Sequence, residues 1–160
     1  MLAGLVLVLP VASLADTLTG EVVGIADGDT LTLLDATKTQ HKIRLAGIDA
    51  PEKNQEFGER SKQNLASLVF RKQVTVEWSK LDRYGRIIGK VLIGSDDMCL
   101  AQVRAGLAWH YKAYQREQSR VDRERYAQAE DEARQGRRGL WRDPSPTPPW
   151  DFRHSHKRRH

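Results

Sequence analysis

The chain has 160 residues, enough for one domain, and its 39% hydrophobic and 29% charged residues exclude a disordered chain and a membrane bundle. Lysine and arginine number 26 against 21 acidic residues, and this net charge of +5 favours an anionic partner without requiring one. The single cysteine, Cys99, excludes an intrachain disulfide and a zinc site built from several cysteines.

Residues 1–15 contain no charged side chain and are apolar from Leu2 to Ala12. A membrane-spanning helix needs about 20 apolar residues, so this run is too short to anchor the protein. The small residues Ser13 and Ala15 follow it, as in the cleavage region of a secretory signal peptide. Because no lysine or arginine precedes the run, a buried first strand or helix is the alternative. We expect a signal peptide over residues 1–15 that is removed on export, and a secreted or periplasmic protein without stable membrane association.

Five segments of the following chain have strand character, either a β-rich composition or an alternation of polar and apolar residues. Three segments have helical character, and Gly106 and Gly136 are placed to end the second and third. Three strands, a helix and two more strands follow the order of a five-stranded Greek-key β-barrel of the oligonucleotide-binding (OB) type, an α+β fold. We therefore expect one such domain over residues 16–142. The expected strands are 18–25, 30–33, 41–45, 73–79 and 86–93, and the expected helices are 57–68, 98–105 and 119–135.

Residues 143–160 hold four of the six prolines and few apolar side chains. Proline fixes φ and removes a hydrogen-bond donor, so we expect a stiff, exposed and disordered basic tail. Its histidines (His154, His156 and His160) could bind a transition metal, but a solvated tail is the favoured interpretation.

Three charged segments stand out against this barrel pattern. Asp27-Gly-Asp-Thr30 places two carboxylates in a turn, although Asp-Gly is also an ordinary hairpin pair. Asp49 and Glu52 flank Pro51, which fixes their offset, although they could equally cap a turn and begin a helix. Asp82-Arg-Tyr-Gly-Arg86 would also suit the tip of a surface hairpin. Each segment alone is ordinary, but a small barrel would bring all three together with the strand-borne Arg44, and that combination indicates a site.

These segments resemble, in order and spacing, the three signature segments of the staphylococcal nuclease (thermonuclease) family. The segments are Asp27-Gly-Asp-Thr30, Arg44-Leu-Ala-Gly-Ile-Asp-Ala-Pro-Glu52 and Asp82-Arg-Tyr-Gly-Arg86. Gly106-Leu-Ala108 and Gly139-Leu-Trp141 also match, so the resemblance covers about residues 18–143. Any one segment would be a weak indication, whereas the three together are highly specific.

The resemblance implies a role for each matching residue. It implies that Asp29, Asp49 and the backbone carbonyl of Ala50 bind Ca²⁺, although the staphylococcal enzyme has threonine in place of this alanine. It implies that Glu52 activates the attacking water. It also implies that two arginines bind the scissile phosphate and that three other residues contact the nucleotide. These residues are Arg44 and Arg86 for the phosphate, and Arg83 (a lysine in the staphylococcal enzyme), Tyr84 and Tyr114 for the nucleotide. Tyr111 and Lys112 are alternatives to Tyr114, the third of these.

The residue types also suit this chemistry on physical grounds. A hard divalent cation prefers oxygen ligands, and a guanidinium presents a planar fork to a phosphate. A carboxylate such as that of Glu52 can take or orient a proton of water. Phosphate contacts carry no sequence information, while Tyr84 and Tyr114 offer faces on which an unpaired base could stack. Trp109 either offers a third such face or packs within the barrel and helices.

We therefore expect a Ca²⁺-dependent endonuclease that hydrolyses DNA and RNA with little sequence preference and favours single strands. The resemblance implies products with 3′-phosphates. The first alternative is a catalytically inactive OB-type nucleic-acid-binding module, and the second is a secreted scaffold whose charges have no function. A monomer is the default expectation.

Overall fold

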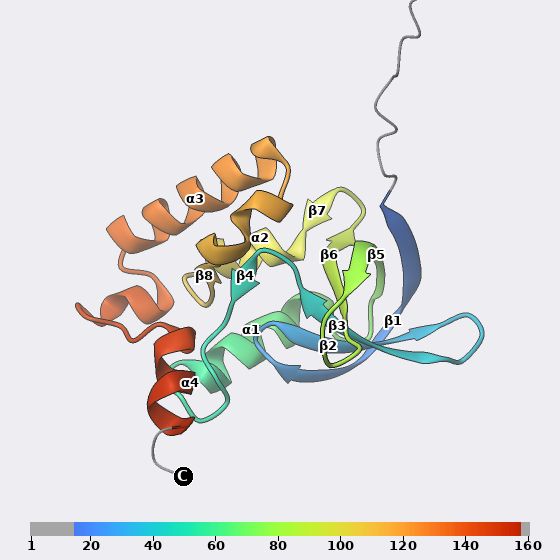
Figure 1. The fold of residues 1–160 in the computed structure, drawn as a ribbon, viewed down its shortest axis with the longest axis horizontal. Coiled ribbons are helices and arrows are strands. Elements are labelled where there is room, and N and C mark those ends of the chain that lie inside the picture. Colours follow the sequence, from blue (N-terminus) through green and yellow to red (C-terminus); the bar gives the residue numbers. More distant parts are fainter. Residues whose placement is uncertain (1–14, 158–160) are drawn as a thin grey trace, which may run out of the picture.

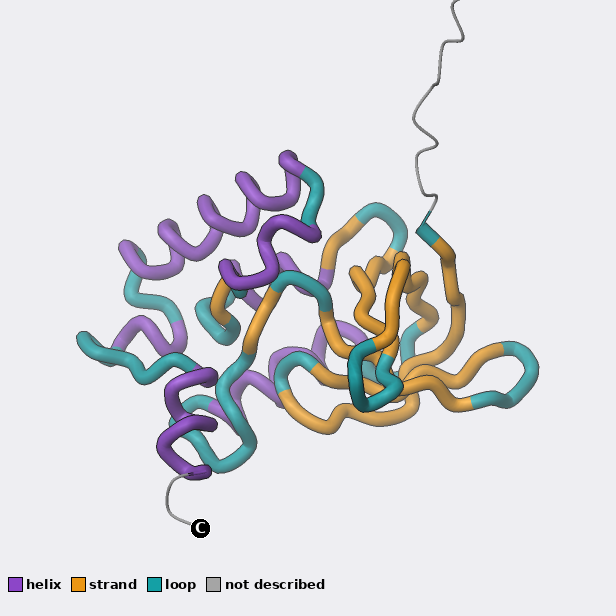
Figure 2. The backbone as a smooth tube through the Cα atoms, viewed as in Figure 1, coloured by secondary structure: helices purple, strands orange, loops and turns teal. Residues whose placement is uncertain are grey.

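The computed structural model of the protein describes residues 15–157 (Figure 1). The expected signal peptide lies outside the described residues, apart from Ala15 at its end. The strands gather on one side of the molecule and most of the helices on the other (Figure 2).

Five long strands form a closed β-barrel. Neighbours in the order β3-β2-β1-β5-β6 pair antiparallel, and a parallel pairing of β3 with β6 closes the barrel. The prediction of an α+β fold built on a five-stranded OB-type barrel is confirmed. The strands are β1 (Asp16–Asp27), β2 (Thr30–Asp35), β3 (Gln40–Leu45), β5 (Gln73–Leu81) and β6 (Ile87–Ile93).

The barrel interior is filled by apolar side chains that alternate with polar ones along each strand. Leu31 and Leu33 of β2 and Ile43 and Leu45 of β3 are buried, whereas their neighbours in each strand are more exposed or polar. This alternation sets the face of each strand, because a shift of one residue would turn its apolar side chains outward.

Three helices cover the barrel, and each begins and ends within one residue of its predicted bounds. They are α1 (Gly58–Val69), α2 (Met98–Arg104) and α3 (Arg120–Gln135). The carboxylate of Asp97 caps α2 by accepting a hydrogen bond from Leu100 N (3.0 Å), and the Ser119 hydroxyl caps α3 by accepting one from Asp122 N (3.1 Å). Helix α3 packs through a narrow apolar stripe, because Tyr126 is buried while Val121 is exposed.

Short elements complete the domain around the barrel. Strand β4 pairs antiparallel with β8, and β7 pairs antiparallel with the end of β6. A second apolar cluster forms where Trp109 and Trp141 pack together with their ring centroids 4.4 Å apart. The short elements are β4 (Ile48–Asp49), β7 (Asp96–Asp97), β8 (Trp109–His110) and the 3₁₀ helices η1 (Lys112–Glu117) and η2 (Gly139–Arg142).

The prediction of a disordered tail is wrong for Pro149–Lys157, which forms helix α4. Proline suits the first position of a helix, where the missing N–H has no intrahelical partner in any case. The indole of Trp150 packs against Trp109, with ring centroids 5.4 Å apart, and stacks parallel on Tyr111 at 5.5 Å. Upstream of α4, the amide of Gln55 donates a hydrogen bond to the carbonyl of Thr147 (2.6 Å). In Figure 1, α4 lies beside the loop that follows β4.

Among residues 15–157, none of the helices combines the length and the apolar character needed to cross a membrane.

Acidification is expected to destabilise the fold through His110, whose side chain is buried. Its Nε2 lies 2.8 Å from Gln118 Oε1, while Nδ1 has no partner among the described residues. Burial lowers the pKa of His110, and the nearby Lys112 ammonium lowers it further, against the opposing effects of Gln118 and Glu130.

In the unfolded chain this histidine is protonated near pH 6.5, whereas in the folded chain it stays neutral to lower pH. The stability that the neutral side chain contributes is therefore complete above pH 6.5 and is lost as the pH falls below it. We expect the free energy of unfolding to fall by up to about 1.4 kcal/mol per pH unit in that window. Urea denaturation from pH 8 to pH 5 measures this, and His110→Gln should flatten the profile. An equal slope in the variant would assign the effect to another group.

Candidate active site

The turn between β1 and β2 is held in place by close contacts of Gly28. A Cβ added to Gly28 would fall 1.8 Å from Ser61 Oγ of α1, so only glycine lets the turn approach the helix this closely. The amide of Gln102, from α2, donates to the Gly28 carbonyl (2.7 Å) and to the Ser61 carbonyl (3.0 Å). Two helices therefore fix the turn that carries the first pair of aspartates.

Asp29 lies at the end of this turn and is buried. Its Oδ1 accepts a hydrogen bond from the Thr30 hydroxyl (3.1 Å), and its Oδ2 accepts one from Ala50 N (2.7 Å). The second bond ties the first predicted acidic segment to the second, 21 residues further along the chain. Asp27 supports the turn by accepting a hydrogen bond from Asp29 N (3.1 Å).

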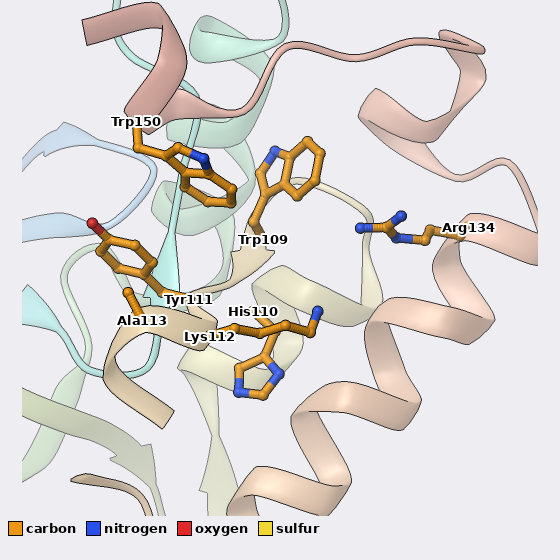
Figure 3. Close-up of a pocket in the computed structure, with 7 residues that line it drawn as sticks. All are labelled: Trp109, His110, Tyr111, Lys112, Ala113, Arg134 and Trp150. Atoms are coloured by element: carbon orange, nitrogen blue, oxygen red, sulfur yellow. The ribbon is translucent and has the colours of Figure 1, made fainter. Parts of the chain in front are cut away.

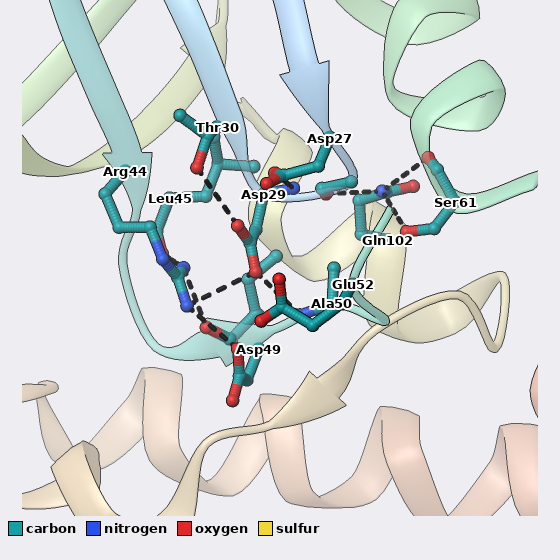
Figure 4. A network of polar contacts seen from close by, with 12 residues as sticks. Asp27, Asp29, Thr30, Arg44, Leu45, Asp49, Ala50, Glu52, Ser61 and Gln102 are labelled. Atoms are coloured by element: carbon teal, nitrogen blue, oxygen red, sulfur yellow. Dashed lines mark hydrogen bonds and ion pairs between the residues drawn. The ribbon is translucent and has the colours of Figure 1, made fainter. Parts of the chain in front are cut away.

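Arg44 connects the two predicted calcium ligands (Figure 4). Thr30 at the start of β2 pairs with Arg44 near the end of β3, which places the arginine beside Asp29. Its Nη2 lies 3.2 Å from Asp29 Oδ2 and 3.1 Å from Asp49 Oδ1. Its Nη1 donates to the backbone carbonyls of Leu45 (2.8 Å) and Ile48 (3.0 Å). Burial opposes the charge of the guanidinium, but the carboxylates of Asp29 and Asp49 outweigh it and raise the pKa of Arg44.

Asp49 belongs to β4, whose pairing with β8 sets it opposite Trp109. Only 1% of its side chain is exposed, and burial raises the pKa of Asp49 against the opposing effects of Arg153 and Arg44. Ala50 is buried beside it. A buried carboxylate of this kind is stable only with close cationic or hydrogen-bonding partners.

Glu52 is the most accessible carboxylate of the group, with 34% of its side chain exposed. The backbone N–H of Glu52 donates to Gln55 Oε1 (3.1 Å), which fixes the chain just after Pro51. The side chain therefore stands at the open side of the group formed by Asp29, Arg44 and Asp49.

Sequence reasoning missed Arg153, which reaches this group from α4. Its Nη1 donates to Asp49 Oδ1 (3.1 Å) and to Glu52 Oε1 (2.7 Å), and its Nη2 donates to Asp49 Oδ2 (2.8 Å). Hydrogen bonds to Asp49 raise the pKa of Arg153 despite partial burial. No local sequence pattern indicates these contacts, because Asp49 and Glu52 lie 104 and 101 residues before Arg153.

The structure does not bring Arg86 into contact with the carboxylates. Its Nε donates to Asp82 Oδ2 (2.6 Å) within its own turn, and its guanidinium lies 5.5 Å from the ring centroid of Tyr84. Arg44 on β3 pairs with Ile88 on β6, so Arg86 lies in the turn before β6, two residues ahead of the position that pairs with Arg44. Asp29, Arg44, Asp49 and Glu52 are joined directly or through Arg153, whereas Arg86 lies in the turn just before the adjacent strand β6.

The predicted nucleotide-contacting residues differ in how accessible they are. Tyr84 is 68% exposed with the Arg83 guanidinium 4.9 Å from its ring centroid, and Tyr114 is also exposed. Trp109 is only 8% exposed in the second apolar cluster, so the expectation that it offers a stacking face is wrong. The alternative to Tyr114, Tyr111, is covered by Trp150.

A pocket of about 390 Å³ lies between β8, η1 and the helices α3 and α4 (Figure 3). Aromatic rings of Trp109, Tyr111 and Trp150 form one part of its wall. The cations Lys112 and Arg134 form another part, and both are ion-paired with the buried carboxylate of Glu130 (2.7 and 3.1 Å).

The ligand atoms available in this group are oxygens, the type that a hard divalent cation prefers. Asp29 and Asp49 offer carboxylate oxygens and Ala50 a backbone carbonyl, with no soft donor among them. Burial, and then the neighbouring charge of Asp29, raise the pKa of Asp27 to about 7. Within residues 15–157, no three histidine, cysteine, aspartate or glutamate side chains converge as a metal-holding group. A bound cation would therefore have two carboxylate ligands and would need water and substrate to complete its shell.

The structure thus groups two aspartates, a glutamate and an arginine at one end of a closed OB-type barrel. The family model described as "Staphylococcal nuclease homologue" matches residues 42–143, and the chain belongs to this family. The match confirms the resemblance drawn from the three signature segments.

Two of the following relatives, both of similar length, carry nuclease names. The chain is 45% identical over 137 residues to an "Uncharacterized endonuclease" of Escherichia coli, a match that covers 84% of each chain. It is 41% identical over 164 residues to a "Micrococcal nuclease" of Shigella flexneri, with 97% of this chain and 91% of the relative covered. It is 42% identical over 156 residues to "Protein ParB" of E. coli, with 91% and 85% covered.

Proposed function

We propose that this protein is a Ca²⁺-dependent endonuclease that hydrolyses DNA and RNA with little sequence preference. The observation that carries the proposal is the bridging of Asp29 and Asp49 by Arg44, with Glu52 at the accessible side of the same group. Membership of a nuclease family makes a phosphodiester the natural substrate.

Asp29, Asp49 and the carbonyl of Ala50 are the residues that would hold the cation. When bound, a divalent cation supplies positive charge that neutralises the diester and lowers the pKa of nearby water. Glu52 then takes or orients a proton of the attacking water, whose oxygen forms a new bond to phosphorus. The bond from phosphorus to the 5′ oxygen breaks, and that oxygen leaves with the electron pair and takes up a proton. The products would carry 3′-phosphates.

Arg44 is positioned to stabilise the phosphate as negative charge grows on its oxygens. Its Nη1 is fixed by the carbonyls of Leu45 and Ile48, so the guanidinium is already oriented before a substrate arrives. Arg86 would contribute from the turn before β6 by exchanging its bond with Asp82 for one with the phosphate.

The exposed rings of Tyr84 and Tyr114 support a preference for single strands, because only an unpaired base presents a free face for stacking. Contacts to phosphates carry no sequence information, so cleavage would depend little on sequence. Export from the cytoplasm and a monomeric state stay predictions from the sequence.

The test is digestion of single- and double-stranded DNA and of RNA by the purified protein with millimolar Ca²⁺, with a chelator, and after Ca²⁺ is restored. We expect cleavage of all three substrates with Ca²⁺, fastest for single strands, and none with the chelator. Asp49→Asn should abolish cleavage, while Asp131→Asn, which changes an exposed aspartate of α3, should not. Binding without cleavage in Ca²⁺ would instead support the inactive binding module.

A further inference from the structure

Helix α4 and the segment before it are docked on the domain by aromatic packing and by a hydrogen bond. Trp150 packs on Trp109 and stacks on Tyr111, and the preceding segment is held through the hydrogen bond from Gln55 to Thr147. Gln55 also accepts the hydrogen bond from Glu52 N, so it contacts both the tail and the chain beside the site. The docking of α4 is therefore directly connected to the position of Glu52.

Arg153 occupies the carboxylate oxygens of the site in a specific geometry. It binds both oxygens of Asp49 through two guanidinium nitrogens and binds Glu52 through one of them. Such paired, charge-assisted hydrogen bonds are among the strongest side-chain contacts. Asp49 is almost completely buried, and 37% of the Arg153 side chain is exposed, so the arginine covers the carboxylate from the solvent side.

The oxygens that Arg153 binds are those that a divalent cation would need. Arg44 contacts only Oδ1 of Asp49, whereas Arg153 binds Oδ2 as well. A divalent cation that used Oδ2 would therefore meet strong repulsion from the Arg153 charge at these distances. The cation must therefore displace Arg153 before it can use both oxygens of Asp49 or approach Glu52.

We propose that α4 is an intramolecular latch that competes with the divalent cation for Asp49 and Glu52, with Arg153 as the competing positive group. The inference rests on the proposed function, because it takes Asp49 as a cation ligand. Coupling between two binding events is reciprocal, so Ca²⁺ must weaken the docking of α4 by the same factor by which α4 weakens Ca²⁺ binding.

The chain offers variants that separate competition by the latch from simple charge effects. Arg153→Gln removes the competing cation. Trp150→Ala leaves all charges in place and weakens only the docking of α4, since Trp150 contacts aromatic rings and none of the carboxylates. Lys157→Gln removes a positive charge from the exposed end of the same helix and serves as the control.

Isothermal titration of each full-length protein with CaCl₂, without nucleic acid, measures the affinities. We expect Arg153→Gln to bind Ca²⁺ about 10-fold more tightly than the wild type, the scale of a charge-assisted hydrogen bond. Trp150→Ala should also bind more tightly, and Lys157→Gln should match the wild type. In the wild type, Ca²⁺ should speed amide hydrogen exchange in residues 149–157.

Equal affinities in the wild type, Arg153→Gln and Trp150→Ala would overturn the latch while leaving the proposed function intact. Weaker binding in Arg153→Gln would also overturn it, because Arg153 would then support the site. If none of the proteins bound Ca²⁺, both the latch and the proposed calcium dependence would be wrong.

Discussion

Glu52→Gln is expected to slow phosphodiester cleavage by about 10²–10⁴-fold, the range typical for loss of a group that transfers or orients a proton. The amide cannot take a proton from water, but it keeps the size of the carboxylate and can still accept the hydrogen bond from Arg153. The side chain is partly exposed, so the fold should be unaffected. Initial rates on a single-stranded oligonucleotide at saturating Ca²⁺ measure the effect.

The matched control is Glu56→Gln, which changes an exposed glutamate four residues further along the same loop. It should cleave at the wild-type rate. Urea denaturation should give the same free energy of unfolding for the wild type and both variants. If Glu52→Gln kept more than a tenth of the wild-type rate, the proton-handling role of Glu52 would be untenable.

Arg44→Ala is expected to lower the free energy of unfolding by about 3–5 kcal/mol, in addition to abolishing cleavage. The change leaves the carboxylates of Asp29 and Asp49 without their shared cation at a buried position. It also removes the donor to the carbonyls of Leu45 and Ile48, which hold the turn after β3. Asp49 keeps Arg153, but Asp29 keeps only the hydrogen bonds from Thr30 and Ala50 N, so its buried charge loses its cationic partner. The cost should therefore exceed that of an exposed ion pair.

Arg71→Ala provides the comparison, because Arg71 is exposed and forms an ion pair with Glu21 (3.1 Å). That variant should lose no more than about 1 kcal/mol. Combining Arg44→Ala with Asp49→Asn should cost less than the sum of the two single changes, since the asparagine leaves no unpaired charge. Additive costs, or a loss below 1 kcal/mol for Arg44→Ala, would show that Arg44 does not bridge these carboxylates.

Local patterns in the sequence were sufficient to predict the barrel and its three covering helices. Leu31 and Leu33 alternate with polar residues, and this alternation alone identifies the buried face of the strand. The predicted grouping of Asp29, Arg44 and Asp49 followed from motif resemblance, and the hydrogen bonds of Arg44 give its physical basis.

The tail was not predictable in this way, because its docking depends on partners far away in the chain. Arg153 binds Asp49 and Glu52, which lie 104 and 101 residues earlier, so no local pattern indicates the contact. The four prolines favoured an exposed segment, whereas packing of Trp150 against aromatic residues of the domain stabilises a helix there. The burial of Trp109 was unpredictable for the same reason, because it depends on the distant Trp141 and Trp150.

Titration of the protein with Ca²⁺, comparing the wild type with Asp29→Asn and with Asp131→Asn as the control, is the decisive measurement for the cation site. Asp29 is buried and bonded to Ala50 N, while Asp131 is exposed on α3. We predict one Ca²⁺ per chain in the wild type and in Asp131→Asn, and binding weakened by at least about 10-fold in Asp29→Asn. Equal Ca²⁺ binding in all three proteins, or cleavage of DNA by the wild type in the presence of a chelator, would contradict a cation held at this end of the barrel.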